Sequence, residues 1–310
     1  MTAPARTWLV TGSAAGLGRA LVTELLARGQ TVAATARDPR ALADLRPPSA
    51  QALWTARLDV TDPEQIRQVV DDAARALGRI DVVISNAGYA LVGAAEEAGR
   101  DQIDRQIRTN LTGPIHLAQA VLPHLRAQGG GRIVQISSMA GQRGSPGTAV
   151  YCATKWGVEG FFESLAAEVK GFGIGVTIVE PGTVSTGFFG RSKEVTTASP
   201  AYAGTPAAIL RRRAEDGRLS CRGDLAKMAG AIVDVATRPR APLRLALGSD
   251  AYGLIRRGLT ARLAELEDQQ QIAFSTDLNG DDGSTTPSTP HRGPEGSEDA
   301  HRRPGARQPR

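Results

Sequence analysis

The stretch Trp8-Leu9-Val10-Thr11-Gly12-Ser13-Ala14-Ala15-Gly16-Leu17-Gly18 joins a short apolar run to a helical pattern that continues to Arg28. A run of this kind, followed at once by glycines and a helical period, is typical of a strand, a tight turn and a helix. Glycines there let the backbone approach a pyrophosphate closely, and the helix N-terminus stabilises the negative charge. The spacing Gly-x-x-x-Gly-x-Gly differs from the commoner dinucleotide fingerprint, and the Gly-Lys-Ser/Thr end of an NTPase phosphate loop is missing. We therefore expect a nucleotide-binding turn after the first strand.

Apolar runs and helical patterns alternate along most of the chain. The runs are mostly apolar on consecutive residues, as expected for parallel strands covered by helices on both faces. The expected strands are 8–10, 31–35, 54–60, 80–85, 132–137, 175–179 and 244–247, and the expected helices are 17–28, 63–77, 100–126, 151–171, 225–237 and 252–271. This order predicts an α/β fold with one domain, a doubly wound (Rossmann) and mostly parallel seven-stranded sheet with helices on both faces.

Two segments depart from this rhythm. Residues 183–222 are rich in Thr, Ser, Gly and Ala, and a long interruption of this kind is usually a functional lid over a substrate. From residue 279 onward there is no Val, Ile, Leu or aromatic residue. We expect a folded domain over 1–278, with the substrate lid at 183–222, and a disordered tail over 279–310.

Composition argues against several classes of protein. The net charge is +5, but the longest basic run is Arg211-Arg212-Arg213 without interleaved aromatic residues, so a nucleic-acid partner is not expected. Two cysteines cannot build a disulfide framework, and the four histidines have no metal-ligand spacing, so no metal site is expected. No signal peptide is visible and no apolar run reaches the ~20 residues that span a bilayer, which predicts a cytoplasmic protein without a membrane partner.

Tyr151 and Lys155 form the most informative pair of side chains. Residues four apart share one helix face, so the ammonium group can lie beside the phenol ring. A free phenol has a pKa near ~10, which is too high for proton transfer at neutral pH. We expect the nearby positive charge to lower the pKa of Tyr151 and to make it a general acid or base.

The end of the second expected strand indicates which dinucleotide binds. A carboxylate at this position binds the ribose 2′-hydroxyl of NAD, whereas an arginine suits the 2′-phosphate of NADP. The chain has Ala36 at the acidic position, followed by Arg37 and Asp38. We therefore expect NADP(H) to be favoured over NAD(H), with Asp38 able to neutralise Arg37 in part.

With these motifs in order, the chain resembles the short-chain dehydrogenase/reductase family over about Arg6 to Leu247, in its single-domain oxidoreductase branch. The resemblance implies a catalytic set of Asn110, Ser138, Tyr151 and Lys155. In that set Ser138 binds the carbonyl oxygen, Tyr151 transfers the proton, and Lys155 lowers its pKa and holds the nicotinamide ribose. Asn110 would sit at a helix irregularity and hold a water in a proton relay. The family's basic residue within the glycine turn is absent here, so the preference for NADP rests on Arg37.

The same resemblance implies the cofactor contacts. The glycine turn would hold the pyrophosphate, Asp59 the adenine amino group, and Val184 with Thr186 the nicotinamide carboxamide. The full set is Gly12, Ser13, Gly16, Leu17, Gly18, Arg37, Asp59, Val60, Asn86, Ala87, Gly88, Tyr151, Lys155, Pro181, Gly182, Val184 and Thr186.

These motifs predict an NADP-dependent oxidoreductase that interconverts a ketone or aldehyde and an alcohol by hydride transfer. A small apolar substrate is expected, because the residues that could line its pocket are mainly apolar or aromatic: Tyr89, Leu91, Phe188 and Phe189, with Gly141-Gln142-Arg143 nearby. The alternative is a catalytically inactive NADP-sensing regulator of the same fold, and a reductase of carrier-bound acyl groups is a third possibility. In the family, the helix of Tyr151 commonly forms a dimer interface, which implies a homodimer or homotetramer.

Overall fold

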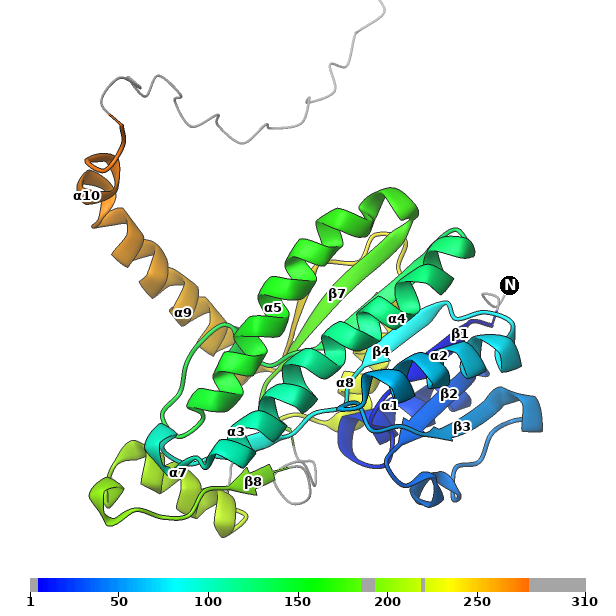
Figure 1. Cartoon of the computed structure of the whole chain (residues 1–310), viewed down its shortest axis with the longest axis horizontal. Coiled ribbons are helices and arrows are strands. Elements are labelled where there is room, and N and C mark those ends of the chain that lie inside the picture. Colours follow the sequence, from blue (N-terminus) through cyan, green and yellow to red (C-terminus); the bar gives the residue numbers. More distant parts are fainter. Residues whose placement is uncertain (1–4, 185–192, 219–220, 279–310) are drawn as a thin grey trace, which may run out of the picture. The chain divides into compact units, whose positions relative to one another are not determined.

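Seven parallel strands form the central sheet of the protein. The computed structural model describes residues 5–184, 193–218 and 221–278 (Figure 1). The strand order is β3-β2-β1-β4-β6-β7-β9. The strands are β1 (Thr7–Val10), β2 (Thr31–Ala36), β3 (Leu53–Arg57), β4 (Val82–Ser85), β6 (Gly131–Ile136), β7 (Ile174–Pro181) and β9 (Arg244–Leu247). The order reverses between β1 and β4, the position where doubly wound sheets bind ligands beyond the carboxyl ends of the strands.

Helices cover both faces of this sheet, as the consecutive apolar residues predict. Trp8 and Val10 point to one face and pack with α1 (Gly16–Ala27) and α8 (Leu225–Ala236). Leu9 points to the other face, which α2 (Pro63–Leu77), α4 (Gly113–Ala127) and α5 (Ala149–Val169) cover. Figure 1 shows α4 and α5 lying over β4 and β7. The predicted fold class is therefore confirmed, and every pair of strands in the sheet is parallel.

The helix expected over 100–126 is interrupted. It consists of α3 (Arg100–Ile107), a π-helical turn (Arg108–Thr112) and α4. A Cβ atom on Gly113, directly after the π turn, would lie 2.6 Å from the Val60 carbonyl oxygen. The chain therefore approaches the end of β3 closely at this point, and only glycine allows it. Asn110 lies within the π turn, so the expected irregularity is present.

The described part of the expected lid contains regular structure. β8 (Lys193–Val195) pairs in parallel with β5 (Ala90–Val92), and α7 (Pro206–Glu215) follows. Lid residues 185–192 and 219–220 lie outside the described part of the chain.

Short 3₁₀ turns occur at Pro39–Leu42, Ala50–Ala52, Ala95–Glu97, Met139–Gly141, Lys170–Phe172 and Pro200–Tyr202.

The residues divide into two compact units, Met1–Arg262 and the chain from Leu263 onward. The last helix expected from the sequence is two helices, α9 (Ser249–Glu267) and α10 (Gln270–Phe274). The expected tail, 279–310, is not among the described residues.

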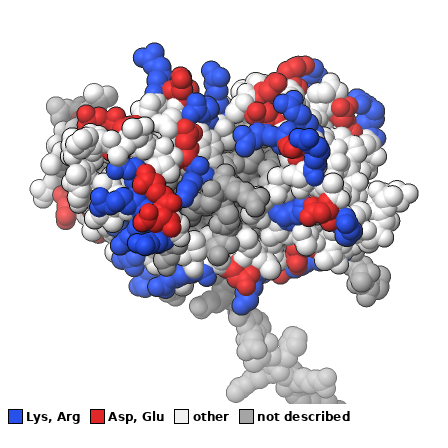
Figure 2. Space-filling view, turned by 90° about the horizontal axis from the view of Figure 1, so that it is seen from below, with Lys and Arg blue, Asp and Glu red and all other residues white. Residues whose placement is uncertain are grey.

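Within the described ranges no helix is long and apolar enough to cross a membrane. Basic and acidic side chains stand next to one another over the face seen in Figure 2.

Candidate functional site

The glycine turn packs directly against the segment that follows β4. Gly12 has φ of 70° and Gly16 has φ of 57°, values that favour glycine. A Cβ atom on Gly12 would lie 2.8 Å from Ala87 Cα, and one on Gly18 would lie 2.3 Å from the Gly12 carbonyl oxygen. Side chains at Gly12 and Gly18 are therefore excluded.

Hydrogen bonds hold Asn86 and Ala87 against this turn. Asn86 Nδ2 donates to the carbonyl oxygens of Thr11 (2.9 Å) and Gly12 (3.2 Å). The Thr11 hydroxyl oxygen accepts from the backbone amides of Asn86 (3.0 Å) and Ala87 (3.1 Å). Thr11 was missing from the predicted site. The sequence feature that could have indicated Thr11 is its place as a polar residue at the end of a buried apolar strand.

The start of α1 suits a phosphate group. Its N-cap residue, Ala15, provides no side-chain hydrogen bond, so no side chain of the cap competes for the first helical amides. Leu17 is 9% exposed. Ser13 is fully buried and its hydroxyl donates to the Val10 carbonyl oxygen at 2.9 Å. The Ser13 side chain thus stabilises the turn itself.

Arg37 is exposed at the carboxyl end of β2. The neighbouring Asp38 carboxylate binds Arg40 at 2.9 Å and also caps the following 3₁₀ turn. The Arg40 guanidinium lowers the pKa of Asp38. Asp38 is therefore committed to Arg40, contrary to the expectation that it would neutralise Arg37.

Asp59 lies beyond the end of β3 and is half-buried, next to the buried Val60. Its carboxylate accepts hydrogen bonds from the Thr61 amide (3.0 Å) and hydroxyl (2.8 Å). Burial raises the pKa of Asp59, but these bonds and the positive charges of Arg37 and Arg57 outweigh it and lower the pKa. Arg37 and Asp59 therefore lie close enough to interact, at the adenosine end of the predicted site.

Three of the four predicted catalytic side chains meet where β6 and α5 approach each other. Ser138 is the N-cap of the 3₁₀ turn after β6, and its hydroxyl accepts from the Ala140 amide at 3.1 Å. Tyr151 and Lys155 lie on the first turns of α5, and Lys155 Nζ is 5.7 Å from the centre of the Tyr151 ring. The ammonium group donates to the Ile136 carbonyl oxygen at 2.9 Å. Tyr151 and Lys155 are 9% and 6% exposed.

The pKa of Tyr151 differs from the prediction. Burial raises it to about 12, and interaction with the Ser138 hydroxyl offsets only part of this rise. Burial also lowers the pKa of Lys155 to about 8, although the negative charge of Glu159 opposes the change. The expected lowering of the tyrosine pKa is therefore wrong for the structure as described, because desolvation of the phenolate outweighs the other contributions.

Asn110 is 1% exposed, and both groups of its side-chain amide are in use. Its Oδ1 accepts from the Tyr89 amide at 3.1 Å, and its Nδ2 donates to the Tyr89 carbonyl oxygen at 2.8 Å. A longer contact of 3.5 Å reaches the hydroxyl of Thr154, which precedes Lys155 on α5. Asn110 thus joins the π turn to the segment after Gly88 and to α5.

The segment after β7 is fixed by a residue that the sequence did not reveal. The Asp250 carboxylate, at the start of α9, accepts from the Thr183 amide (2.8 Å) and hydroxyl (2.7 Å). A Cβ atom on Gly182 would lie 2.1 Å from Asp250 Oδ1. Pro181, Gly182 and Val184 therefore have a defined position at the carboxyl edge of the sheet, whereas Thr186 lies outside the described residues.

The expected substrate-lining residues have different surroundings. Tyr89 is half-buried, but Leu91 is only 3% exposed and packs inside the protein. Gln142 is also buried, and its amide binds Glu159 and Glu180 rather than facing a pocket. Phe188 and Phe189 are not among the described residues. Apolar contacts flank Tyr151 instead, and these come from Ala90, Val92, Ala140, Leu210 and Ala214.

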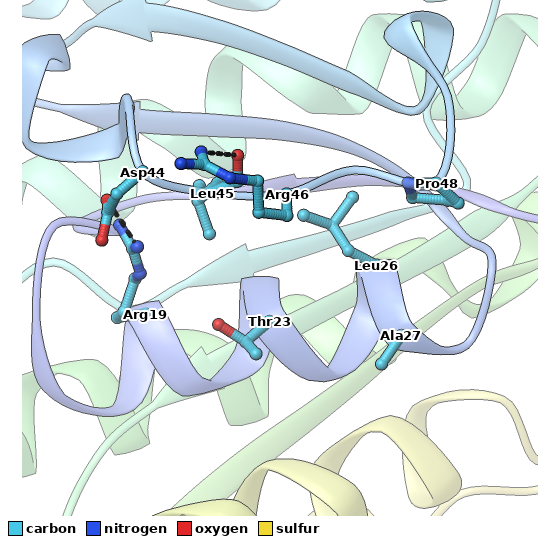
Figure 3. Close-up of a pocket in the computed structure, with 8 residues that line it drawn as sticks. All are labelled: Arg19, Thr23, Leu26, Ala27, Asp44, Leu45, Arg46 and Pro48. Carbon is cyan, nitrogen blue, oxygen red and sulfur yellow. Dashed lines mark hydrogen bonds and ion pairs between the residues drawn. The ribbon is translucent and has the colours of Figure 1, made fainter.

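A pocket of about 510 Å³ lies elsewhere, between α1 and the chain after Leu42 (Figure 3). Its lining residues are Arg19, Thr23, Leu26, Ala27, Asp44, Leu45, Arg46 and Pro48. Arg19 and Asp44 form an ion pair of 2.6 Å. None of the predicted catalytic or cofactor-binding residues lines this pocket, so we do not assign it a part in the chemistry.

Known proteins share both the sequence and the fold. A family model described as short chain dehydrogenase matches residues 6–196. Oxidoreductase BOA17 of Botryotinia fuckeliana is 40% identical over 273 residues, which are 87% of this chain and 98% of that protein.

Solved structures agree with these matches. The crystal structure of a short-chain dehydrogenase from Streptomyces avermitilis is 39% identical, has a TM-score of 0.82, and aligns with 89% of this chain and 100% of its own. A Burkholderia phymatum short-chain dehydrogenase/reductase, solved with NAD, shares the fold at 21% identity and a TM-score of 0.74, over 87% of this chain and 96% of its own. The chain belongs to the short-chain dehydrogenase/reductase family of oxidoreductases.

Proposed function

We propose that this protein is an NADP-dependent oxidoreductase that interconverts a ketone or aldehyde and an alcohol. The observation that carries the proposal is the meeting of Ser138, Tyr151 and Lys155 between the end of β6 and α5. A hydroxyl donor, a phenol and an ammonium group in one place are the groups needed to bind and protonate a developing alkoxide. The nicotinamide cofactor supplies or accepts the hydride.

The described residues fit such a cofactor. The uncapped start of α1 and the glycine turn would bind the pyrophosphate, and Asp59 and Val60 would contact the adenine. Arg37 would bind the 2′-phosphate, since it is exposed and the adjacent carboxylate is paired with Arg40. This is the basis for preferring NADP to NAD. The remaining contacts would come from residues near the nicotinamide ring: Asn86, Ala87, Gly88, Tyr151, Lys155, Pro181, Gly182 and Val184.

In the reductive direction the side chains have separate tasks. The Ser138 hydroxyl donates a hydrogen bond to the carbonyl oxygen as negative charge develops on it. Tyr151 transfers its proton to that oxygen. With a pKa of about 12, the phenol stays protonated until negative charge develops on the oxygen. Lys155, with a pKa of about 8, is mostly charged at neutral pH and stabilises the phenolate that remains. Asn110 holds the π turn in contact with α5 on the path by which a proton would return to Tyr151.

An apolar carbonyl compound or alcohol is the substrate class that these surroundings favour. Apolar side chains from β5 and α7 pack with Tyr151. Two basic residues of the lid have partners, since Lys193 donates to the Ala214 carbonyl oxygen and Arg211 pairs with Glu97, whereas Arg212 and Arg213 are exposed.

The test is the variant Tyr151→Phe. We expect turnover of NADPH with ketones and aldehydes of graded size to fall by ~10²–10⁴-fold, because the proton donor is removed. NADPH binding, followed by fluorescence titration, should change little. Tyr252→Phe is the control, since Tyr252 is 62% exposed on α9. Substantial activity in Tyr151→Phe would show that the acid is misassigned, and NADPH binding by the wild type without turnover of any substrate would favour the regulator.

A further inference from the structure

A group of polar side chains, three buried and one partly exposed, lies on the side of α5 that faces the sheet. We call Gln142, Glu159, Glu180 and Arg244 the carboxyl clamp. Glu159 and Glu180 are 4% and 2% exposed, and Gln142 is 9% exposed. The four residues come from α5, β7, β9 and the chain after Ser138. None of them has a part in the reaction described above.

One amide and one guanidinium group join the two carboxyl groups. Gln142 Nε2 donates to Glu159 Oε2 at 3.1 Å and to Glu180 Oε1 at 3.0 Å. Arg244 Nε lies 3.0 Å from the same Glu159 oxygen and 3.5 Å from the same Glu180 oxygen. The two carboxyl groups therefore share their donors and lie next to each other.

Two carboxylates in such proximity cannot both ionise at little cost. Arg244 supplies one positive charge against two carboxylates, and its Nη2 is also used by Glu163 at 2.9 Å. Glu159 Oε1 is buried without a hydrogen-bond partner in the described part of the protein. Burial, followed by the negative charge of Glu159, raises the pKa of Glu180 to about 7. The donors Gln142 and Arg244, and the single positive charge of Arg244, match the pair best when the pair holds one proton.

The clamp connects the segments that carry the catalytic residues. Glu159 is one helical turn after Lys155, Glu180 directly precedes Pro181, and Gln142 follows Ser138 through a short turn. The packing there is close, because a Cβ atom on Gly141 would lie 2.7 Å from Ser137 Oγ and 2.9 Å from Glu159 Cγ. Any widening of the carboxyl pair would move these segments relative to one another.

We propose that the Glu159–Glu180 pair shares one proton and, through it, positions the Ser138 turn, α5 and the end of β7 for catalysis. The proposal rests on the function proposed above. Both members of the pair are positioning residues, since neither touches the reacting atoms. Loss of the shared proton places a second negative charge in the clamp and pushes the two carboxylates, and with them the catalytic segments, apart.

The other charged groups that face the pair are few. Lys155 and Glu163 face it from α5, and Arg244 faces it from β9. From α9, Arg262 Nη2 approaches Gln142 Oε1 at 3.4 Å. Glu163 is 58% exposed, so solvent screens its charge.

The sign of the pH effect follows from the raised pKa of Glu180. Its ordinary value is 4.5, and its folded value is about 7. The unfolded chain therefore releases this proton first, so the stabilising contribution is complete below pH 4.5 and is lost as the pH rises to about 7. In the folded enzyme the proton leaves near pH 7, which we expect to weaken turnover above that pH.

Glu180→Gln tests the proposal, because the neutral amide imitates the protonated acid. In the wild type we expect kcat/KM for reduction to fall as the pH rises above about 7. In Glu180→Gln this midpoint should move up toward the pKa of about 8 of Lys155. Glu168→Gln is the matched control, since it removes an exposed carboxylate from the same helix and should leave the profile unchanged.

A second measurement does not depend on turnover. The Tm of the wild type should fall between pH 4.5 and 7, and the fall should be smaller in Glu180→Gln by at least about 2 °C. Equal profiles of Tm and kcat/KM against pH in the wild type and Glu180→Gln would overturn the proposal. A Glu180→Gln chain that fails to fold would also overturn it, since the neutral amide would then not replace the acid. An inactive wild type with the expected Tm profiles would count against the proposed function and leave the shared proton supported.

Discussion

The pKa of Tyr151 illustrates how strongly burial acts on a single residue. The ring lies among apolar side chains from β5 and α7, and the phenolate would have to form there without water. Lys155 is close, but its ammonium group is bonded to the Ile136 carbonyl oxygen and is itself partly desolvated. A tyrosine in this environment is protonated in the resting state. It is therefore suited to donate a proton to a developing alkoxide rather than to act as a base. The positive charge of an oxidised nicotinamide would favour the phenolate during alcohol oxidation.

At the same scale, we propose that Arg37 sets a preference for NADP. Arg37→Ala should weaken NADPH binding by about 10–100-fold, because a hydrogen bond between charged groups contributes roughly 1.5–3 kcal/mol. NADH binding should change far less, since NADH has no 2′-phosphate. Both dissociation constants can be measured by fluorescence titration. Arg57→Ala is the control, because it removes another exposed guanidinium near Asp59. Equal losses for NADPH and NADH in Arg37→Ala would contradict the preference for NADP.

At the scale of elements, Glu97 joins the lid to the body of the protein. Its side chain is fully buried and lies 2.5 Å from the Arg211 guanidinium of α7, which is 6% exposed. It also accepts hydrogen bonds from the Ala94 amide, the Thr196 hydroxyl and the Ser199 amide. Burial alone would raise the pKa of Glu97, but these donors lower it to about 2. The β5–β8 pair and this carboxylate therefore hold the described part of the lid.

Glu97→Ala should destabilise the protein by about 3–5 kcal/mol, because it leaves the buried Arg211 charge with only the longer, 3.8 Å pair to the half-exposed Glu215. Denaturant unfolding measures this change. Glu194→Gln, which breaks the more exposed pair with Arg105, should cost less than about 1 kcal/mol. Because the pKa of Glu97 is lowered, its contribution is present above pH 4.5 and is lost as the pH falls toward 2. Similar losses in the two variants would show that Glu97 does not anchor the lid.

At the scale of the whole molecule, α5 has an exposed face that we propose pairs with a second copy. Ala153, Trp156 and Gly160 are exposed on it, Trp156 by 42%. A Cβ atom on Gly160 would meet no atom within 4 Å, so a larger side chain fits there in a single copy.

We predict a homodimer or homotetramer formed through this face, measurable by light scattering. Gly160→Arg should shift the protein toward the monomer without loss of helical content in circular dichroism, because the added side chain separates the two helices. Gln68→Arg, on the exposed side of α2, should leave the assembly unchanged. A wild type that scatters as a clean monomer would refute the prediction.

Local spacing explains what could be predicted. The glycine turn, the start of α2 at Asp62 and Pro63, and the shared face of Tyr151 and Lys155 each depend on residues a few positions apart. The sequence by itself therefore determined the sheet, its covering helices and the shared helix face of Tyr151 and Lys155. The irregularity at Asn110 was expected only from the family resemblance, and the structure gives its bounds, Arg108–Thr112, and the close approach of Gly113 to Val60 across the fold.

Only the tertiary structure decided the environment of the catalytic groups. Gln142 and Glu180 are 38 positions apart, Arg244 and Glu159 are 85 apart, and Thr183 and Asp250 are 67 apart. No periodicity in the sequence brings such residues together; the crossovers of the sheet do. Desolvation likewise depends on everything that surrounds a group, which is why the pKa of Tyr151 rose where the nearby lysine alone predicted a fall.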